Sequence, residues 1–178
     1  MPIHVAFLRA INTGRRRVKN DKLCACFEAM GFEGVSAFLA SGNVLFDVGK
    51  ESMAGMETRI ALGLQDCLGY EVPTFVRSAT EVSRLASRQP FPEAMVVPSA
   101  GNVQVALLAT QPTASDHGAA LALATPEDAL DIEDRNLYWL PMTTISESAL
   151  NLGRLEAILG PMTIRTQRTM ARLTAVFG

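Results

Sequence analysis

Residues able to hold an anion gather in two short stretches of the chain, one early and one near the end. From Arg9 to Lys22 there are six basic residues and one acidic residue, and from Arg154 to Arg172 there are four basic and one acidic. The whole chain nevertheless has a formal charge of −2, so the rest of it is acidic. This asymmetry favours an anionic partner, although a role in balancing acidic surfaces elsewhere stays open.

The candidate ligand-binding residues share guanidinium, amide or hydroxyl groups, which can donate hydrogen bonds to phosphate oxygens. They are Arg9, Asn12, Arg15, Ser41, Asn43, Arg165, Thr166 and Arg168. Thr166 is also placed to cap a helix, and two arginines at a helix start oppose the helix dipole unless an anion or carboxylate lies nearby. Ser41-Gly42-Asn43 is equally typical of an ordinary hairpin turn.

The familiar catalytic and metal-binding patterns do not occur in the sequence. It contains no phosphate-binding loop, dinucleotide fingerprint or nucleophile elbow. Cys24 and Cys26 do not have a metal or redox spacing, and the acidic run over 127–134 lacks the calcium-loop pattern, so we expect a solvated hairpin there. We therefore expect neither a metal nor a cofactor. Whether the protein is an enzyme stays open, because no catalytic constellation is recognisable.

Composition limits the class of protein. With 48% hydrophobic and 19% charged residues, the chain is not a disordered protein. No apolar run approaches the roughly 20 residues that cross a membrane, and no export signal is recognisable, so we expect a soluble cytoplasmic protein. Three cysteines are an odd number, which favours free thiols over a disulfide framework. Nothing in the sequence indicates an oligomeric state.

The elements that must position these residues follow from hydrophobic spacing. In the first half, strands are predicted over 4–8, 35–39, 44–46 and 73–77, with helices from about residue 20 to Met30 and from about Glu51 to Leu68. Gly31-Phe32 and Gly69-Tyr70 are typical helix ends. The order β-α-β-β-α-β predicts a ferredoxin-like unit.

The second half repeats this order. Strands are predicted over 102–109, 129–132, 137–140 and 163–165, helices over 113–123 and 148–159, and a terminal helix follows. A short helix over 81–88, introduced by the capping pair Ser78 and Glu81, lies between the halves. We therefore predict an α+β protein of two tandem ferredoxin-like units with a C-terminal helix. The predicted parts are a first unit 1–78, a helix and connector 79–101 and a second unit 102–178.

This topology brings polar residues together. The first and third strands of such a unit are antiparallel neighbours, so Arg9 and Asn12 are expected near Ser41 and Asn43, with the basic loop 13–17 leaving from the same edge. Backbone amides and guanidinium groups there could form an anion pocket. We further expect Arg165, from the second unit, to share that pocket.

Three motifs then suggest a relationship. Ala6-Phe7-Leu8-Arg9-Ala10-Ile11-Asn12, Ser41-Gly42-Asn43-Val44-Leu45-Phe46 and Thr163-Ile164-Arg165-Thr166-Gln167-Arg168-Thr169 occur in this order. Together they resemble the uncharacterised bacterial family called domain of unknown function 1697. That family typically opens with Leu-Leu-Arg-Gly-Ile-Asn-Val-Gly-Gly, shows Ser-Gly-Asn-Val and closes with Thr-Thr-Arg-Asn. The resemblance spans almost the whole chain and implies an α+β fold, but no activity and no catalytic residue.

The chain departs from the family pattern at three positions. Ala10 replaces a glycine, Arg15 stands where a second glycine is usual, and Thr166 takes the asparagine position. These changes make a glycine-dependent loop site less secure.

Three function classes follow. The first is a non-catalytic module that binds an anionic, phosphate-bearing small molecule or nucleic acid through its basic loops. Both sheet faces are apolar, so we do not expect an open platform for stacking RNA bases. The second is a small enzyme that holds an anionic metabolite, with Asp47 as the nearest carboxylate. The third is a protein-interaction scaffold that presents Tyr138 and Trp139.

Overall fold

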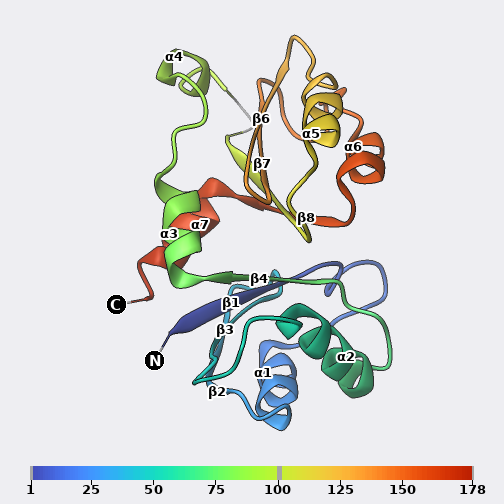
Figure 1. Ribbon diagram of the computed structural model, residues 1–178, viewed down its shortest axis with the longest axis vertical. Helices are drawn as coiled ribbons and strands as arrows, with labels where there is room; N and C mark the ends of the chain where they lie inside the picture. Colours follow the sequence, from blue (N-terminus) through green and yellow to red (C-terminus); the bar gives the residue numbers. More distant parts are fainter. Residues whose placement is uncertain (1, 100–101, 178) are drawn as a thin grey trace. The chain divides into compact units, whose positions relative to one another are not determined.

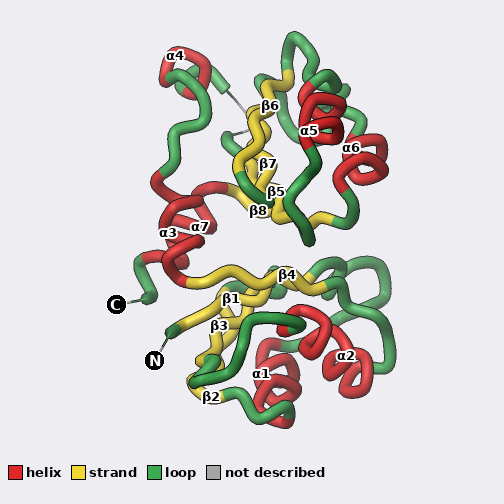
Figure 2. The backbone as a smooth tube through the Cα atoms, viewed as in Figure 1, coloured by secondary structure: helices red, strands yellow, loops and turns green. Residues whose placement is uncertain are grey.

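The computed structural model describes residues 2–99 and 102–177 and divides into two compact units (Figure 1). One comprises Met1–Val82 with Val176–Gly178, and the other comprises Ser83–Ala175. Each contains a four-stranded antiparallel sheet with helices (Figure 2). Residues 100 and 101 of the predicted connector lie outside the described residues. No helix in the described part of the chain is long and apolar enough to span a membrane.

The first unit has the predicted ferredoxin-like topology. Its elements are β1 (Ile3–Leu8), α1 (Asn20–Ala29), β2 (Glu33–Phe38), β3 (Asn43–Asp47), α2 (Met56–Leu68) and β4 (Thr74–Ser78), and α3 (Ala79–Ser87) follows β4. The strand order is β2-β3-β1-β4, with β1 antiparallel to both β3 and β4. At the start of α3, Glu81 N donates to Ser78 Oγ (3.2 Å) and Ser78 N donates to Glu81 Oε2 (2.7 Å), as the predicted capping pair requires.

The second unit repeats the topology. It begins within α3, and its next helix, α4 (Glu93–Val96), is too brief for a periodic pattern to predict. The repeated elements are β5 (Gln104–Leu108), α5 (Ala114–Leu121), β6 (Asp128–Glu133), β7 (Asn136–Pro141), α6 (Leu152–Leu159) and β8 (Met162–Thr166), and α7 (Gln167–Thr174) is the predicted terminal helix. The strand order is β6-β7-β5-β8. The prediction of two tandem ferredoxin-like units is therefore confirmed.

Two helices begin later than the hydrophobic spacing predicts. The helix expected from about Glu51 begins at Met56, because Gly55 has a left-handed backbone (φ 76°) and interrupts the pattern. The helix expected from Ser148 begins at Leu152, where Asn151 accepts a hydrogen bond from Arg154 N and caps it (2.9 Å). Hydrophobic residues before a cap can pack on the core without being helical.

The core of the first unit lies between its sheet and its two helices. Ala6, Leu8 and Phe46 on the sheet pack in one cluster with Phe27 on α1 and Ile60 on α2, and all five are buried. The opposite face of β1 presents Val5 and Phe7, which are also completely buried. Both faces of the central strand are therefore covered, as predicted, and no open base-stacking platform exists there.

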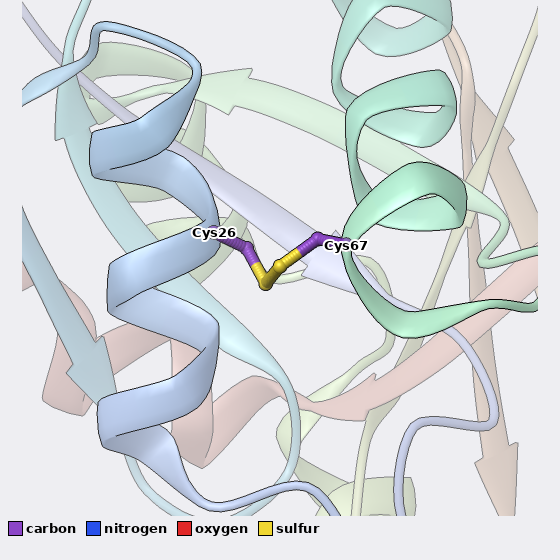
Figure 3. The surroundings of a disulfide bond; sticks show 2 residues. All are labelled: Cys26 and Cys67. Atoms are coloured by element: carbon purple, nitrogen blue, oxygen red, sulfur yellow. A yellow bond between two sulfur atoms is a disulfide. The ribbon is translucent and has the colours of Figure 1, made fainter.

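A disulfide between Cys26 and Cys67 joins α1 to α2 (Figure 3). The expectation of three free thiols is wrong for these two residues, and Cys24 alone is free among the described cysteines. Counting cysteines cannot show that helix packing brings two Cα atoms to 5.9 Å. Cys24, two residues before Cys26, lies about 200° away around the helix and is turned from α2.

The acidic hairpin of the second unit is more structured than expected. Asp128 is only 1% exposed and accepts hydrogen bonds from Thr125 Oγ1 (2.7 Å), Trp139 Nε1 (2.8 Å) and Ser148 Oγ (2.6 Å). The prediction of a solvated hairpin is therefore wrong for Asp128. Burial acts to raise the pKa of Asp128, but the three hydrogen bonds together hold it below its ordinary value.

The rest of that hairpin is tied to a neighbouring arginine. Arg88 pairs with Asp131 (2.5 Å) and Glu133 (2.7 Å), and its guanidinium lies over the Tyr138 ring at 5.1 Å. Tyr138 and Trp139 are buried, so the expectation that they present a partner surface is wrong. Within residues 2–99 and 102–177, no group of three or more His, Cys, Asp or Glu residues is placed to hold a metal ion.

The Ser-Gly-Asn turn depends on close approach at Gly42. Its backbone is left-handed (φ 75°), its carbonyl accepts from Leu8 N (2.8 Å), and an added Cβ would lie 2.9 Å from Ile11 Cγ2. We expect Gly42→Ala to lower the free energy of unfolding by about 2 kcal/mol or more, measured by urea titration. Gly49→Ala is the control, because Gly49 is also left-handed (φ 56°) with no atom within 4 Å of an added Cβ. Equal losses would show that packing at Gly42 contributes nothing.

Asp128 should make stability depend on pH. Its pKa is lowered in the folded protein, so its contribution is present above the unfolded pKa of about 4 and disappears as pH falls through the folded pKa. We expect Asp128→Asn to cost about 2 kcal/mol at pH 7, and the difference from wild type to shrink below about pH 4. Urea titrations of both proteins between pH 3 and pH 7 measure this. A difference independent of pH would contradict the role of the charge.

Candidate anion-binding site

The cationic loop of the first unit borders a cavity of about 480 Å³. The cavity is formed by that loop, the start of α1 and the end of α2. Its lining residues are Arg16, Arg17, Val18, Lys19, Lys22, Cys67, Leu68 and Tyr70. Four of them carry a positive charge and none carries a carboxylate. The cavity therefore has the charge expected of an anion site.

Asn12 holds the loop that supplies the arginines. Its Oδ1 accepts from Val18 N (2.8 Å), and its Nδ2 donates to the Ala40 carbonyl (2.9 Å). These bonds close residues 13–17 into a compact loop and attach it to the turn before β3. Asn12, predicted as a ligand residue, thus positions the loop with both ends of its amide.

Arg17 and Arg16 are ordered in different ways. Arg17 Nη1 donates to the carbonyls of Gly14 (3.2 Å) and Arg16 (2.9 Å), so it braces the loop. The Arg16 guanidinium lies 4.1 Å from the centroid of the Tyr70 ring, a cation–π contact that orients the charge beside the end of α2. Both side chains are thus held near the cavity before any ligand arrives.

Tyr70 also has a polar group that is shielded from solvent. Among the described residues, nothing forms a hydrogen bond with its buried hydroxyl. Because this hydroxyl is shielded from solvent, Tyr70 contributes its ring to the site, through the contact with Arg16, and not a hydrogen bond to a ligand.

The start of α1 adds backbone donors. The N-cap of this helix is Lys19, which makes no side-chain capping bond. The first amides of α1 are therefore without a side-chain cap, and a helix N-terminus attracts anions. Lys19 and Lys22 oppose the helix dipole at this end and Asp21 complements it, and a bound anion would add to the effect of Asp21.

The cations that line the cavity are not paired with any acid of the described residues, although Asp21 lies in the first turn of α1 between Lys19 and Lys22. In the part of the chain that the structure describes, Arg16, Arg17, Lys19 and Lys22 form no ion pair. By contrast, Arg59 pairs with Glu51 and Arg77 lies 3.7 Å from Glu57 in the same unit.

The other predicted residues of the first unit mainly build the structure. Asn43 is completely buried and donates through Nδ2 to Phe38 O (3.1 Å) and Ser41 Oγ (2.8 Å), so these two polar residues hold the turn. Arg9 is half-buried, and its backbone N donates to Pro73 O (3.0 Å). Arg15 is exposed on the basic loop and does not line the cavity.

The predicted cluster of the second unit lies at the junction of β8 and α7. Arg165 Nη1 donates to Thr163 Oγ1 and Ile164 O, both at 2.9 Å, and burial lowers the pKa of Arg165 to about 10. Thr166 caps α7 by accepting from Thr169 N (3.1 Å), as predicted, and Arg168 is exposed. Arg9 and Arg165 belong to different units, and a pocket shared by them stays a prediction.

Comparison of the two units shows what the fold itself requires. The first unit connects its first strand to its first helix through residues 9–19, whereas the second uses only 109–113, with no arginine or lysine. The basic loop is therefore an addition to the shared topology. The sequence predicted the charge of this loop, but not that Tyr70 and Cys67, from the end of α2, line the same cavity. Tyr70 could have been suspected, because it is an aromatic residue with a polar group directly after Gly69, which ends the helix.

The backbone at Ala10 explains one departure from the family pattern. Ala10 is left-handed (φ 56°), at the position where the family has glycine. Gly14, two residues after Asn12, is also left-handed (φ 58°) and keeps the family's glycine. The loop is therefore left-handed at both positions, with a strained alanine at one of them.

The comparisons with known proteins agree with this architecture. The chain is similar to the conserved bacterial protein SP0830 from Streptococcus pneumoniae, at 17% sequence identity and a TM-score of 0.72, over 99% of this chain and 98% of that one. At this identity the likeness shows the fold alone. No curated protein matches the chain.

The sequence pattern of one family covers most of the chain. Described as "Protein of unknown function (DUF1697)", it matches residues 1–138, which include the first two of the three motifs. On this match, the chain belongs to the DUF1697 family.

Proposed function

We propose that the protein is a binding module whose basic cavity, in the first unit, holds a small phosphate-bearing molecule. The observation that carries the proposal is a 480 Å³ cavity lined by four cations and by no carboxylate. Its volume lies within the range of about 300–1,000 Å³ typical of small-molecule sites. The amides at the start of α1, which have no side-chain cap, supply further donors.

A small molecule fits this site better than nucleic acid. Single-strand readers of this topology stack bases on exposed aromatics of the central strands, whereas Phe7 and Phe46 are buried. The positive charge is instead concentrated in one concave site beside a helix N-terminus, as in phosphate-binding sites.

The residues around the cavity favour binding over catalysis. Cys67 is engaged in the disulfide, and the arginines and lysines are better suited to holding charge than to accepting a proton. Asp47, the carboxylate considered for an enzyme, does not line this cavity.

The first test measures binding of inorganic pyrophosphate and a nucleoside diphosphate by isothermal titration calorimetry at low salt. We expect measurable affinity that falls as sodium chloride is added, because the attraction is electrostatic. Arg16→Ala and Lys22→Ala should each weaken binding about tenfold or more, since each removes a charge-assisted contact.

Arg154→Ala is the matched control, because Arg154 is an exposed arginine of the second unit and does not line the cavity. No binding at low salt, or equal losses in Arg154→Ala, would contradict the proposal. A single-stranded oligonucleotide that bound more tightly than pyrophosphate would point to nucleic acid instead.

The second test separates loop position from charge. Asn12→Ala removes two hydrogen bonds of the basic loop but no charge. We expect it to weaken pyrophosphate binding severalfold and to speed amide hydrogen exchange over residues 13–18, because the arginines lose their fixed positions.

Asn151→Ala serves as its control, because Asn151 caps α6 of the second unit and its loss should cost stability without affecting the cavity. If Asn12→Ala binds pyrophosphate as wild type does, the loop does not position the site.

A further inference from the structure

We infer that the Cys26–Cys67 disulfide regulates the basic cavity, which binds its anionic ligand tightly when the bond is formed and weakly when it is reduced. The inference rests on the proposed function of that cavity. The affinity of the cavity for its ligand would then depend on the redox state of the disulfide as well as on the charge of the cavity.

The disulfide lies in the wall of the cavity. Cys67 lines it, whereas Cys26 is 1% exposed within the core of the first unit. The bond joins α1, which carries Lys22, to the last turn of α2, just before Tyr70 (Figure 3). The two helices that supply opposite sides of the site are therefore covalently held together.

The shared topology forms without such a bond in the second unit. The second unit packs the equivalent helices α5 and α6 without cysteine, since all three cysteines of the chain lie in the first unit. The bond occurs only in the unit that has the basic cavity. The sequence also predicts a cytoplasmic protein, and disulfides in that reducing compartment are usually transient, catalytic or redox-sensing.

The cavity offers a reductant a route to one sulfur atom. The thiolate of a dithiol reductant, drawn by the surrounding cations, attacks Cys67 Sγ. The disulfide breaks, and its electron pair leaves on Cys26 Sγ, which takes up a proton. The second thiol of the reductant then attacks the mixed disulfide and releases Cys67. One protein disulfide and one dithiol thus become two protein thiols and one reductant disulfide.

Reduction weakens binding because α1 and α2 are no longer tied. The ligand must then order a site that the disulfide had already ordered.

The experiment measures pyrophosphate affinity by calorimetry for the full chain in its oxidised form, after reduction with dithiothreitol, and after re-oxidation. Thiol titration reports the state of the cysteines, and circular dichroism reports folding. We expect roughly fivefold or greater loss of affinity on reduction, restored on re-oxidation. Cys24→Ser should respond as wild type does, and the double variant Cys26→Ser, Cys67→Ser should bind equally under both conditions.

Each outcome of this experiment supports or overturns the redox regulation of the cavity. Equal affinity of folded oxidised and reduced protein overturns the inference and leaves the proposed function intact. A redox response that disappears in Cys24→Ser, or persists in the double variant, also overturns it, because another group would be responsible. No pyrophosphate binding in either state removes both the proposed function and its regulation. The re-oxidation cycle keeps the inference testable if the double variant does not fold.

Discussion

The antiparallel pairing of β1 with β3 and β4 is the constraint on which the first unit depends. Because β1 is central, every residue from Val5 to Leu8 is buried, and the chain leaves the sheet only at Arg9. That exit lies beside the turn before β3, where Leu8 N bonds Gly42 O and Asn12 bonds Ala40 O. The basic loop therefore starts beside the turn before β3, to which Asn12 attaches it, and runs into α1.

Duplication of the architecture makes the differences between the units informative. Both units repeat the same strand order, and in both the last strand is followed directly by a helix, α3 or α7. Only the first has the long basic loop and the disulfide, and only the second has the Asp128 network that ties Trp139 and Ser148 together. Features shared by both units serve the fold, whereas those confined to one unit are candidates for a function of that unit.

The motif residues and the cavity residues have different tasks. Asn12, Ser41 and Asn43 form hydrogen bonds within the loop and the turn before β3. Gly42 permits the close approach of the backbone that this turn needs. Arg16 and Lys22, which belong to no motif, carry the charge. Polar residues that recur in a pattern can thus be the scaffold of a site, because a loop must be held before it can present anything.

The sequence by itself determined the repeated elements of both units and their order, though not α4, because hydrophobic spacing, glycine helix ends and capping pairs are local properties of neighbouring residues. It also determined that the early loop is basic. Only the tertiary structure decided that Cys26 meets Cys67, that Tyr70 joins Arg16 at the cavity, and that Asp128 is buried beneath three donors. These facts depend on distances between residues remote in the chain, which arise when helices pack on a sheet and leave no trace in local periodicity.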